Sequence, residues 1–278
     1  MEPLTPVDAV PLFAPLHAEL VALLRGLDDA DWAGPTVAGA WRVRDVAAHL
    51  LDGELRRLSA ARDGVQLAAD GPVESFGDVV GLINGLNASG VAYARRLSPR
   101  IITDLLEVTG RWISGYFASL PPHETATWPV AWAGEARSEN WMDVGRDYTE
   151  QWHHQMQIRD AVGAPGLLQR RWLHPLLDLS VRAFRRAYQG VEAAEGTAVV
   201  FEVRAEGENT WSVVRQADGW EVFRGAAPGA AARVRTDADT AWRLLYHALS
   251  PEAARARVSV EGNATLAEPI IRTRSVMV

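Results

Sequence analysis

The sequence contains no cysteine among its 278 residues. Disulfides, cysteine-ligated zinc and a thiol nucleophile belonging to the protein itself are therefore excluded. Any metal must be held by histidine, aspartate or glutamate, and any thiol chemistry must use a thiol brought by another molecule. Lysine is absent too, so that all 28 residues counted as lysine or arginine are arginine. We interpret this as the coding bias of a GC-rich genome.

An excess of positive charge is also missing. The formal net charge is −7, which argues against a nucleic-acid partner and against a polybasic membrane anchor. The N-terminal stretch has no basic segment followed by an apolar one, so no secretory signal is expected. No apolar run reaches the length of about 18 residues that a membrane span needs. We therefore expect a cytoplasmic protein with no nucleic-acid or membrane partner.

The first 165 residues show the apolar spacing of helices. Four such segments have short connections, which predicts an antiparallel four-helix bundle, with a fifth helix as an alternative. Ser98-Pro99 is a helix start, since proline in the first turn loses no hydrogen bond. The expected helices are Ala9–Leu27, Val43–Arg62, Phe76–Leu97, Pro99–Pro121 and Val144–Val162.

The pattern changes after Gly163–Leu168, which looks like a linker. One amphipathic helix, Arg171–Tyr188, is followed by short β-branched runs, and Ala217-Asp218-Gly219 between two of them predicts a hairpin turn. Helices are expected again after Asp237. The sequence thus predicts an all-α domain over 1–165 and a smaller α+β domain with an antiparallel sheet over 169–278.

Glu150 and His154 lie four residues apart in the last bundle helix. This spacing places them one turn apart on one face, close enough to bind a single cation. His49, in the middle of another helix and on its apolar stripe, is expected to point into the bundle. Two imidazoles and one carboxylate leave coordination positions open, as a catalytic metal needs.

Each part of this pattern also has a plainer interpretation. A Glu–His pair at this spacing is often a solvated surface contact, and a histidine on an apolar stripe is often a hydrogen-bonded core residue. His153 could replace His154 in another helix register, although it has Thr149 rather than an acid one turn before it. Spacing alone leaves these alternatives open.

Two sequence blocks resemble the DinB/YfiT-like metalloprotein superfamily, in particular its mycothiol-dependent maleylpyruvate isomerase branch. The first block, Thr36–Leu50, is similar to that family's W-s-v-r-D-v-x-a-H-L signature. The second, Glu150–Gly163, is similar to its E-x-x-x-H-x-x-x-I-R-x-A-x-G block. The resemblance covers about residues 8–165. Weaker matches after residue 209 resemble the sterol-carrier-like domain that accompanies this branch.

The resemblance implies that His49, Glu150 and His154 bind a divalent metal. Many DinB relatives have a second histidine where Glu150 stands, and the glutamate is typical of the mycothiol-dependent branch. Zn²⁺ is the preferred occupant, with Ni²⁺, Fe²⁺ or Mn²⁺ as alternatives. The resemblance also implies mycothiol or a related thiol as cosubstrate.

Other acidic and aromatic residues lie near the two blocks. Asp45 is open to two roles, orienting the His49 imidazole or favouring the start of its helix. Asp160 could form a hydrogen bond to the metal ligand His154 or pair with Arg159. Asp52 and Glu54 are expected to be solvated. Several tryptophans, such as Trp41, could pack the bundle or form an apolar wall around the metal.

Three functions follow from this interpretation. The favoured one is a metal-dependent enzyme that uses a low-molecular-weight thiol for isomerisation or thiol transfer on a small electrophile. The second is a metal-dependent hydrolase of a small amide or ester. The third is a non-catalytic protein with a structural metal and a small-ligand site in the sheet domain. The expected partners are a small substrate and a thiol, in a monomer or homodimer.

Overall fold

The computed structural model describes residues 1–66 and 74–276, which form two compact units. The helical unit contains Asp8–Trp128 and Glu139–Gly166. The sheet unit contains residues 167–276 and also takes up Met1–Val7 and Pro129–Ser138. The division into 1–165 and 169–278 stays a prediction. The two added segments show that the chain crosses between the units more than once.

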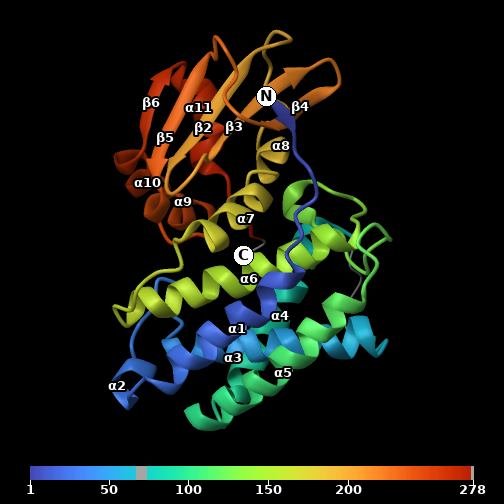
Figure 1. Cartoon of the computed structure of the whole chain (residues 1–278), viewed down its shortest axis with the longest axis vertical. Helices are drawn as coiled ribbons and strands as arrows, with labels where there is room; N and C mark the ends of the chain where they lie inside the picture. Colours follow the sequence, from blue (N-terminus) through green and yellow to red (C-terminus); the bar gives the residue numbers. More distant parts are fainter. Residues whose placement is uncertain (67–73, 277–278) are drawn as a thin grey trace. The chain divides into compact units, whose positions relative to one another are not determined.

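The helical unit is a bundle of long helices (Figure 1). Helices α1, α3, α5 and α6 pack around a shared core, and α4 packs against α3. A short helix, α2, and a π-helical turn, Leu58–Arg62, complete the unit. The helix bounds are α1 Val10–Arg25, α2 Asp29–Trp32, α3 Val43–Arg57, α4 Phe76–Ala94, α5 Pro99–Ser119 and α6 Asn140–Ala161.

Apolar side chains at helical spacing fill the core of this unit. Leu20 of α1, Leu50 of α3, Leu106 of α5 and Ile158 of α6 belong to one buried cluster. Helix α5 begins as predicted, because the Ser98 hydroxyl accepts a hydrogen bond from the Ile101 N–H at 3.3 Å. The predicted helical bundle is confirmed. Within residues 1–66 and 74–276, every helix is too short or too polar to cross a lipid bilayer.

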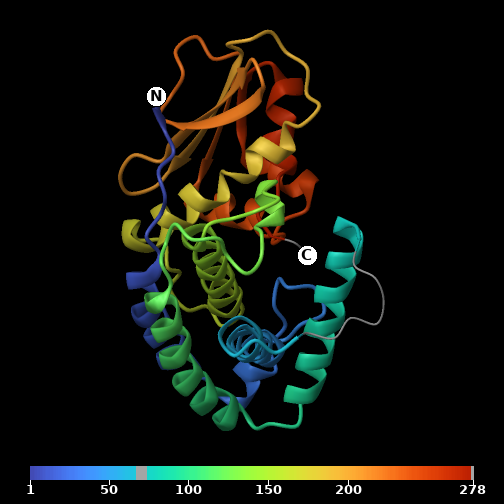
Figure 2. The same cartoon turned by 90° about the vertical axis from the view of Figure 1, so that its right-hand side faces the viewer.

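The sheet unit contains a six-stranded sheet in the order β1-β4-β3-β2-β5-β6. Figure 2 shows α8 and α11 on the same side of this sheet. Ala232, Val234 and Thr236 of β5 are buried and alternate with half-buried residues, as expected for a strand with one covered face. The strand bounds are β1 Glu2–Pro3, β2 Ala198–Arg204, β3 Thr210–Gln216, β4 Gly219–Arg224, β5 Ala232–Asp237 and β6 Ser259–Gly262.

The helices of the sheet unit are α7 Arg170–Ser180, α8 Ala183–Ala187, α9 Ala238–Leu245, α10 Pro251–Arg257 and α11 Ala264–Arg272, with a 3-10 turn at Ala131–Ala133. The single helix expected over Arg171–Tyr188 is wrong, since α7 ends at Ser180. The Ser180 hydroxyl bonds the Leu176 carbonyl at 2.7 Å and the Tyr246 hydroxyl at 2.5 Å, which ties the end of α7 to the residue after α9.

The predicted hairpin is present. Gln216 pairs with Gly219, and Gly219 has a φ of 147°, a value that favours glycine. The sheet is mostly antiparallel, as predicted, but β2 and β5 form one parallel pair. Strand β5 lies on the far side of β2 from the β3–β4 hairpin and runs in the same direction as β2. The alternation of apolar residues along a strand does not indicate whether its neighbour is parallel or antiparallel, so this pairing could not be predicted.

Candidate metal centre

Helix α3 carries His49, and its start is fixed by Asp45. The Asp45 carboxylate accepts a hydrogen bond from the Arg42 backbone N–H at 3.1 Å and pairs with Arg95 Nε at 2.9 Å. Asp45 therefore has the second of its two expected roles, at the helix start. It does not orient His49, since the buried His49 Nδ1 has no hydrogen-bond partner among the described residues.

Helix α6 carries the other two candidate ligands. His154 Nε2 lies 3.4 Å from Glu150 Oε2 across one helical turn. One donor atom each from His49, Glu150 and His154 lie within 4.8 Å of one another. In the part of the chain that the structure describes, no other three side chains of metal-binding type come together in this way. The three residues predicted as ligands thus lie side by side.

Gln157 orients His154. The Gln157 Oε1 atom lies 2.8 Å from His154 Nδ1. An amide oxygen accepts only, so Nδ1 carries the proton and donates it. The lone pair is then on Nε2, which faces Glu150. Asp160, the other residue expected to support His154, is exposed on α6.

The neighbouring histidine, His153, has a different environment. Its side chain is buried, and its Nδ1 lies 2.8 Å from the Thr149 carbonyl oxygen, to which it donates. Its ring centroid is 3.9 Å from that of His154. The Thr149 carbonyl, four residues back in α6, therefore holds His153 beside the three converging residues.

The charges of the site suit a divalent cation. Burial, reinforced by the nearby His154, holds the pKa of His49 well below its usual value, so His49 is neutral at neutral pH. Burial alone would raise the pKa of Glu150, but the neighbouring His153 and His154 outweigh it and lower that pKa. Two imidazoles and an anionic carboxylate are the donor set that Zn²⁺ accepts. The residues present fit the metal.

Trp41 lies beside both imidazoles. Its ring centroid is 5.0 Å from that of His49 and 6.4 Å from that of His154. The Trp41 carbonyl accepts a 2.7 Å hydrogen bond from the Thr36 hydroxyl, which braces the loop before α3. Trp41 is half-buried and forms an apolar wall at the site.

Glu54 was expected to be solvated, and this is wrong: its side chain is buried in the bundle core. It follows the buried residues Leu50 and Leu51 on the same stripe of α3. Its carboxylate accepts hydrogen bonds from His17 and Thr109 and, at 2.7 Å, from Gln151 Nε2. Asp52 is half-buried and pairs with Arg56 at 2.7 Å, so it too is not simply solvated.

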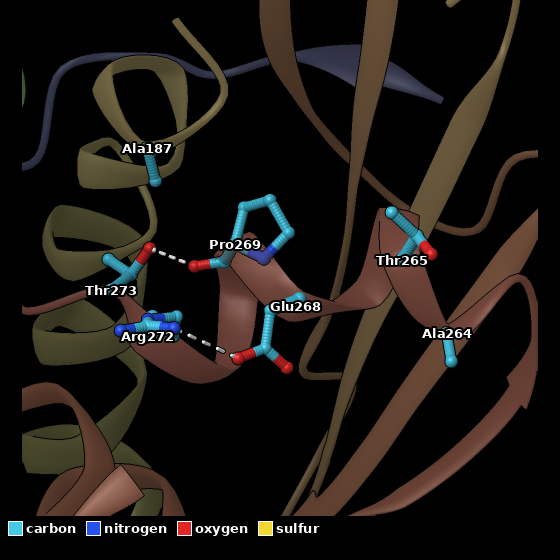
Figure 3. Close-up of a pocket in the computed structure, with 7 residues that line it drawn as sticks. All are labelled: Ala187, Ala264, Thr265, Glu268, Pro269, Arg272 and Thr273. Carbon is cyan, nitrogen blue, oxygen red and sulfur yellow. Dashed lines mark hydrogen bonds and ion pairs between the residues drawn. The ribbon is translucent and has the colours of Figure 1, made fainter.

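A hollow of about 650 Å³ lies in the sheet unit (Figure 3). Its lining is mostly apolar and includes Ala187 of α8 and Pro269 of α11. The one carboxylate in the lining, Glu268, pairs with Arg272 at 3.7 Å and also with Arg255. The described lining therefore has no free acid or base for catalysis.

Comparison with known families decides where the chain belongs. A sequence profile described as the mycothiol maleylpyruvate isomerase N-terminal domain matches residues 13–159, more than half of the 278 residues. The chain belongs to this family. The match spans all three residues of the candidate metal centre.

Solved structures agree on the fold of this family. The crystal structure of the mycothiol-dependent maleylpyruvate isomerase is 12% identical, with a TM-score of 0.56 over 91% of this chain and 92% of that one. A histidine-to-alanine mutant of that isomerase is 11% identical, with the same TM-score and coverage. These likenesses show the fold. No curated protein matches the sequence significantly.

A third structure, the ubiquinone synthesis protein UbiJ-SCP2, is 16% identical with a TM-score of 0.24, over 31% of this chain and 73% of that one. So low a score carries no argument. The sterol-carrier-like character of the C-terminal domain stays a prediction.

Proposed function

We propose that this protein is a metal-dependent enzyme that uses a low-molecular-weight thiol, mycothiol or a close relative, on a small electrophilic substrate. The observation that carries the proposal is the convergence of His49, Glu150 and His154 within 4.8 Å, in a member of the mycothiol maleylpyruvate isomerase family. Isomerisation is the favoured reaction, and thiol transfer is the alternative.

The three side chains would hold the cation, with zinc as the preferred ion. A divalent metal supplies positive charge that keeps a bound thiol in its nucleophilic thiolate form. Gln157 keeps the Nε2 lone pair of His154 directed at the site. Glu150 contributes negative charge, and Trp41 shields the imidazoles from water on one side.

The exposure of Glu150 favours catalysis over a purely structural metal. Its side chain is 36% exposed, whereas that of His154 is 9% exposed. A structural metal site is normally closed by its protein ligands. A ligand side chain that is only partly buried leaves room for a thiol and a substrate to approach.

The thiol must come from outside the protein, because the chain has no cysteine. Addition of its thiolate to one carbon of a cis carbon–carbon double bond, conjugated to a carbonyl, turns that bond into a single bond. The substrate then rotates about it, and loss of the thiolate restores the double bond in the trans form. The thiol is regenerated and acts as a cofactor of the isomerisation.

A thiol-dependence assay on the purified, zinc-loaded protein tests this proposal. Cis–trans isomerisation of maleylpyruvate is followed with and without mycothiol, and loss of free thiol is followed with electrophiles such as monochlorobimane. We expect turnover only with the thiol present, and loss of turnover in Glu150→Gln. Turnover that is unchanged without any thiol would contradict the proposal.

A further inference from the structure

A network of charged side chains continues from the candidate metal centre along α3 and α6. Arg57 pairs with Asp143 at 2.7 Å and with Asp147 at 2.9 Å. Arg146 pairs with Asp143 at 2.6 Å and with Asp147 at 3.5 Å. Asp147 lies three residues before Glu150 on α6, so the network and the centre share one face of that helix.

Helices α3 and α6 run antiparallel at this point. His49, in the first half of α3, lies with Glu150 and His154, whereas Arg57, at the end of α3, pairs with the first half of α6. Gly53 lies four residues after His49 and four before Arg57, on the stripe that joins them. It therefore stands between the two sets of side chains.

Open space adjoins Gly53. A Cβ atom added at this position would meet no atom within 4 Å, apart from neighbouring chain atoms and the helix's own backbone. Glycine in the middle of a helix costs roughly 0.5–1 kcal/mol relative to alanine. Gly90 shows the contrasting case, since a Cβ there would lie 2.2 Å from the Asp52 carboxyl carbon. Packing against other protein atoms thus explains Gly90, whereas Gly53, like Gly115 of α5, adjoins open space.

The network presents one acceptor and one donor towards solvent. The side chains of Arg57 and Asp143 are only 5% and 3% exposed, whereas those of Arg146 and Asp147 are 17% and 22% exposed. Two arginines and two aspartates sum to zero charge, and Glu150 beside them is negative. A further carboxylate would meet no free positive charge at this network, but a neutral hydroxyl-rich group finds both an acceptor and a donor.

Aromatic rings also contact the network. The Arg57 guanidinium lies 4.9 Å from the centre of the Trp128 ring and 5.4 Å from that of Phe117. These contacts, together with its two ion pairs, restrain the Arg57 side chain. Groups that are ordered before binding lose less entropy when a ligand arrives.

We infer that the space beside Gly53 binds the hydroxyl-rich, sugar-like part of the thiol cosubstrate, with Asp147 accepting and Arg146 donating hydrogen bonds to its hydroxyls. This rests on the proposed function, because the sulfur of the same molecule would reach the centre formed by His49, Glu150 and His154. The small electrophile then does not use this network for its carboxylates.

The test compares two thiols by calorimetry on the zinc-loaded protein. Mycothiol carries sugar-like rings on its cysteinyl group, whereas N-acetylcysteine, used as its neutral amide, carries the cysteinyl group without the rings and without a carboxylate charge. The variants are Gly53→Leu, which fills the space, and Asp147→Asn, which removes a charged acceptor. Gly53→Ala is the matched control, because it improves the helix and adds a single carbon. Zinc content and thermal unfolding are measured for each.

We expect wild-type protein and Gly53→Ala to bind mycothiol more tightly than N-acetylcysteine. Gly53→Leu should weaken mycothiol binding because it fills the space. Asp147→Asn should weaken it by about tenfold, as loss of a charged hydrogen bond does. N-acetylcysteine binding and zinc content should not change.

Equal binding of the two thiols by wild-type protein would overturn the inference and leave the proposed function standing. The inference is also overturned if Gly53→Leu weakens both thiols alike, since it would then act on the sulfur or the metal. If neither thiol binds the zinc-loaded protein, the proposed function fails, and the inference fails with it.

Discussion

His154 donates a hydrogen bond from Nδ1 to Gln157 Oε1 at 2.8 Å, and its Nε2 lies 3.4 Å from Glu150 on the opposite side of the ring. The hydrogen bond to Gln157 fixes the tautomer of His154 with the proton on Nδ1. This tautomer leaves the lone pair of Nε2 available for a metal. Gln157 is only 5% exposed, so the contact is shielded from water. The orientation of this ligand therefore depends on a residue that would not itself touch the metal.

Replacing Gln157 should weaken zinc binding. We expect Gln157→Leu to lower zinc affinity by roughly 10–100-fold, because His154 loses the acceptor that orients it. Gln157→Glu keeps an acceptor and should retain affinity. Competition with a chromophoric chelator measures both. The exposed Asp160→Asn is the control, and equal affinities in Gln157→Leu and Asp160→Asn would contradict the assignment.

Two glycines of α5 provide a matched pair for the buried cluster of His17 and Glu54. A Cβ at Gly110 would lie 2.4 Å from His17 Nδ1, whereas one at Gly115 would meet nothing within 4 Å. Gly110→Ala should destabilise the protein by about 1–3 kcal/mol through overpacking. Gly115→Ala should stabilise it by roughly 0.5–1 kcal/mol. Urea unfolding measures both, and shifts of the same sign would refute the packing argument.

Removing Glu54 should be costly. Glu54→Ala leaves the His17 ring and the Gln151 amide buried without their acceptor. Breaking a buried charged pair typically costs about 3–5 kcal/mol. Denaturant unfolding of the metal-free protein isolates this effect from zinc binding. Asp63→Ala, at an exposed position, is the control. A decrease in unfolding free energy below about 1 kcal/mol for Glu54→Ala would show that the pairing of Glu54 with His17 is not stabilising.

The same pair should make stability depend on pH. Burial alone would lower the pKa of His17, but the adjacent Glu54 carboxylate outweighs it and raises that pKa above its usual value. The folded state then holds a proton that the unfolded state releases above about pH 6.5. The stabilisation is therefore complete below that pH and is lost as the pH rises through the pKa of the folded protein.

The difference in unfolding free energy between wild-type protein and His17→Gln measures this contribution. It should shrink as the pH rises from about 6 to 9 in a chelator-containing buffer. Effects of the other histidines cancel in the difference. A difference that grows over this range would show that the pKa of His17 is lowered on folding rather than raised.

Much of the fold could be predicted because it depends on local sequence patterns. Leu20, Leu50 and Ile158 each lie on the apolar stripe of their own helix, and Ala217-Asp218-Gly219 marks the hairpin. The parallel pairing of β2 with β5 could not be predicted, because a strand's alternation is the same for either direction of its neighbour. The break after Ser180 was missed because the residue that bonds it, Tyr246, lies 66 positions away.

The candidate site shows the same division. The spacing of Glu150 and His154 indicates their common face, the apolar stripe of its helix makes His49 the candidate third ligand, and the two family blocks support all three residues. Gln157 lies three residues after His154, a spacing that could have identified it, but the choice between it and Asp160 depends on side-chain direction. Glu54 was misjudged because its partners His17 and Thr109 lie 37 and 55 positions away, beyond any local pattern.

The metal content of the purified protein tests the central claim most directly. Elemental analysis of the wild type, His49→Ala, His154→Ala and the exposed control His123→Ala would be made after identical loading with zinc and removal of the excess. The account predicts close to one zinc ion per chain in the wild type and in His123→Ala, and a large loss in the other two variants. Full zinc content in both His49→Ala and His154→Ala would contradict it.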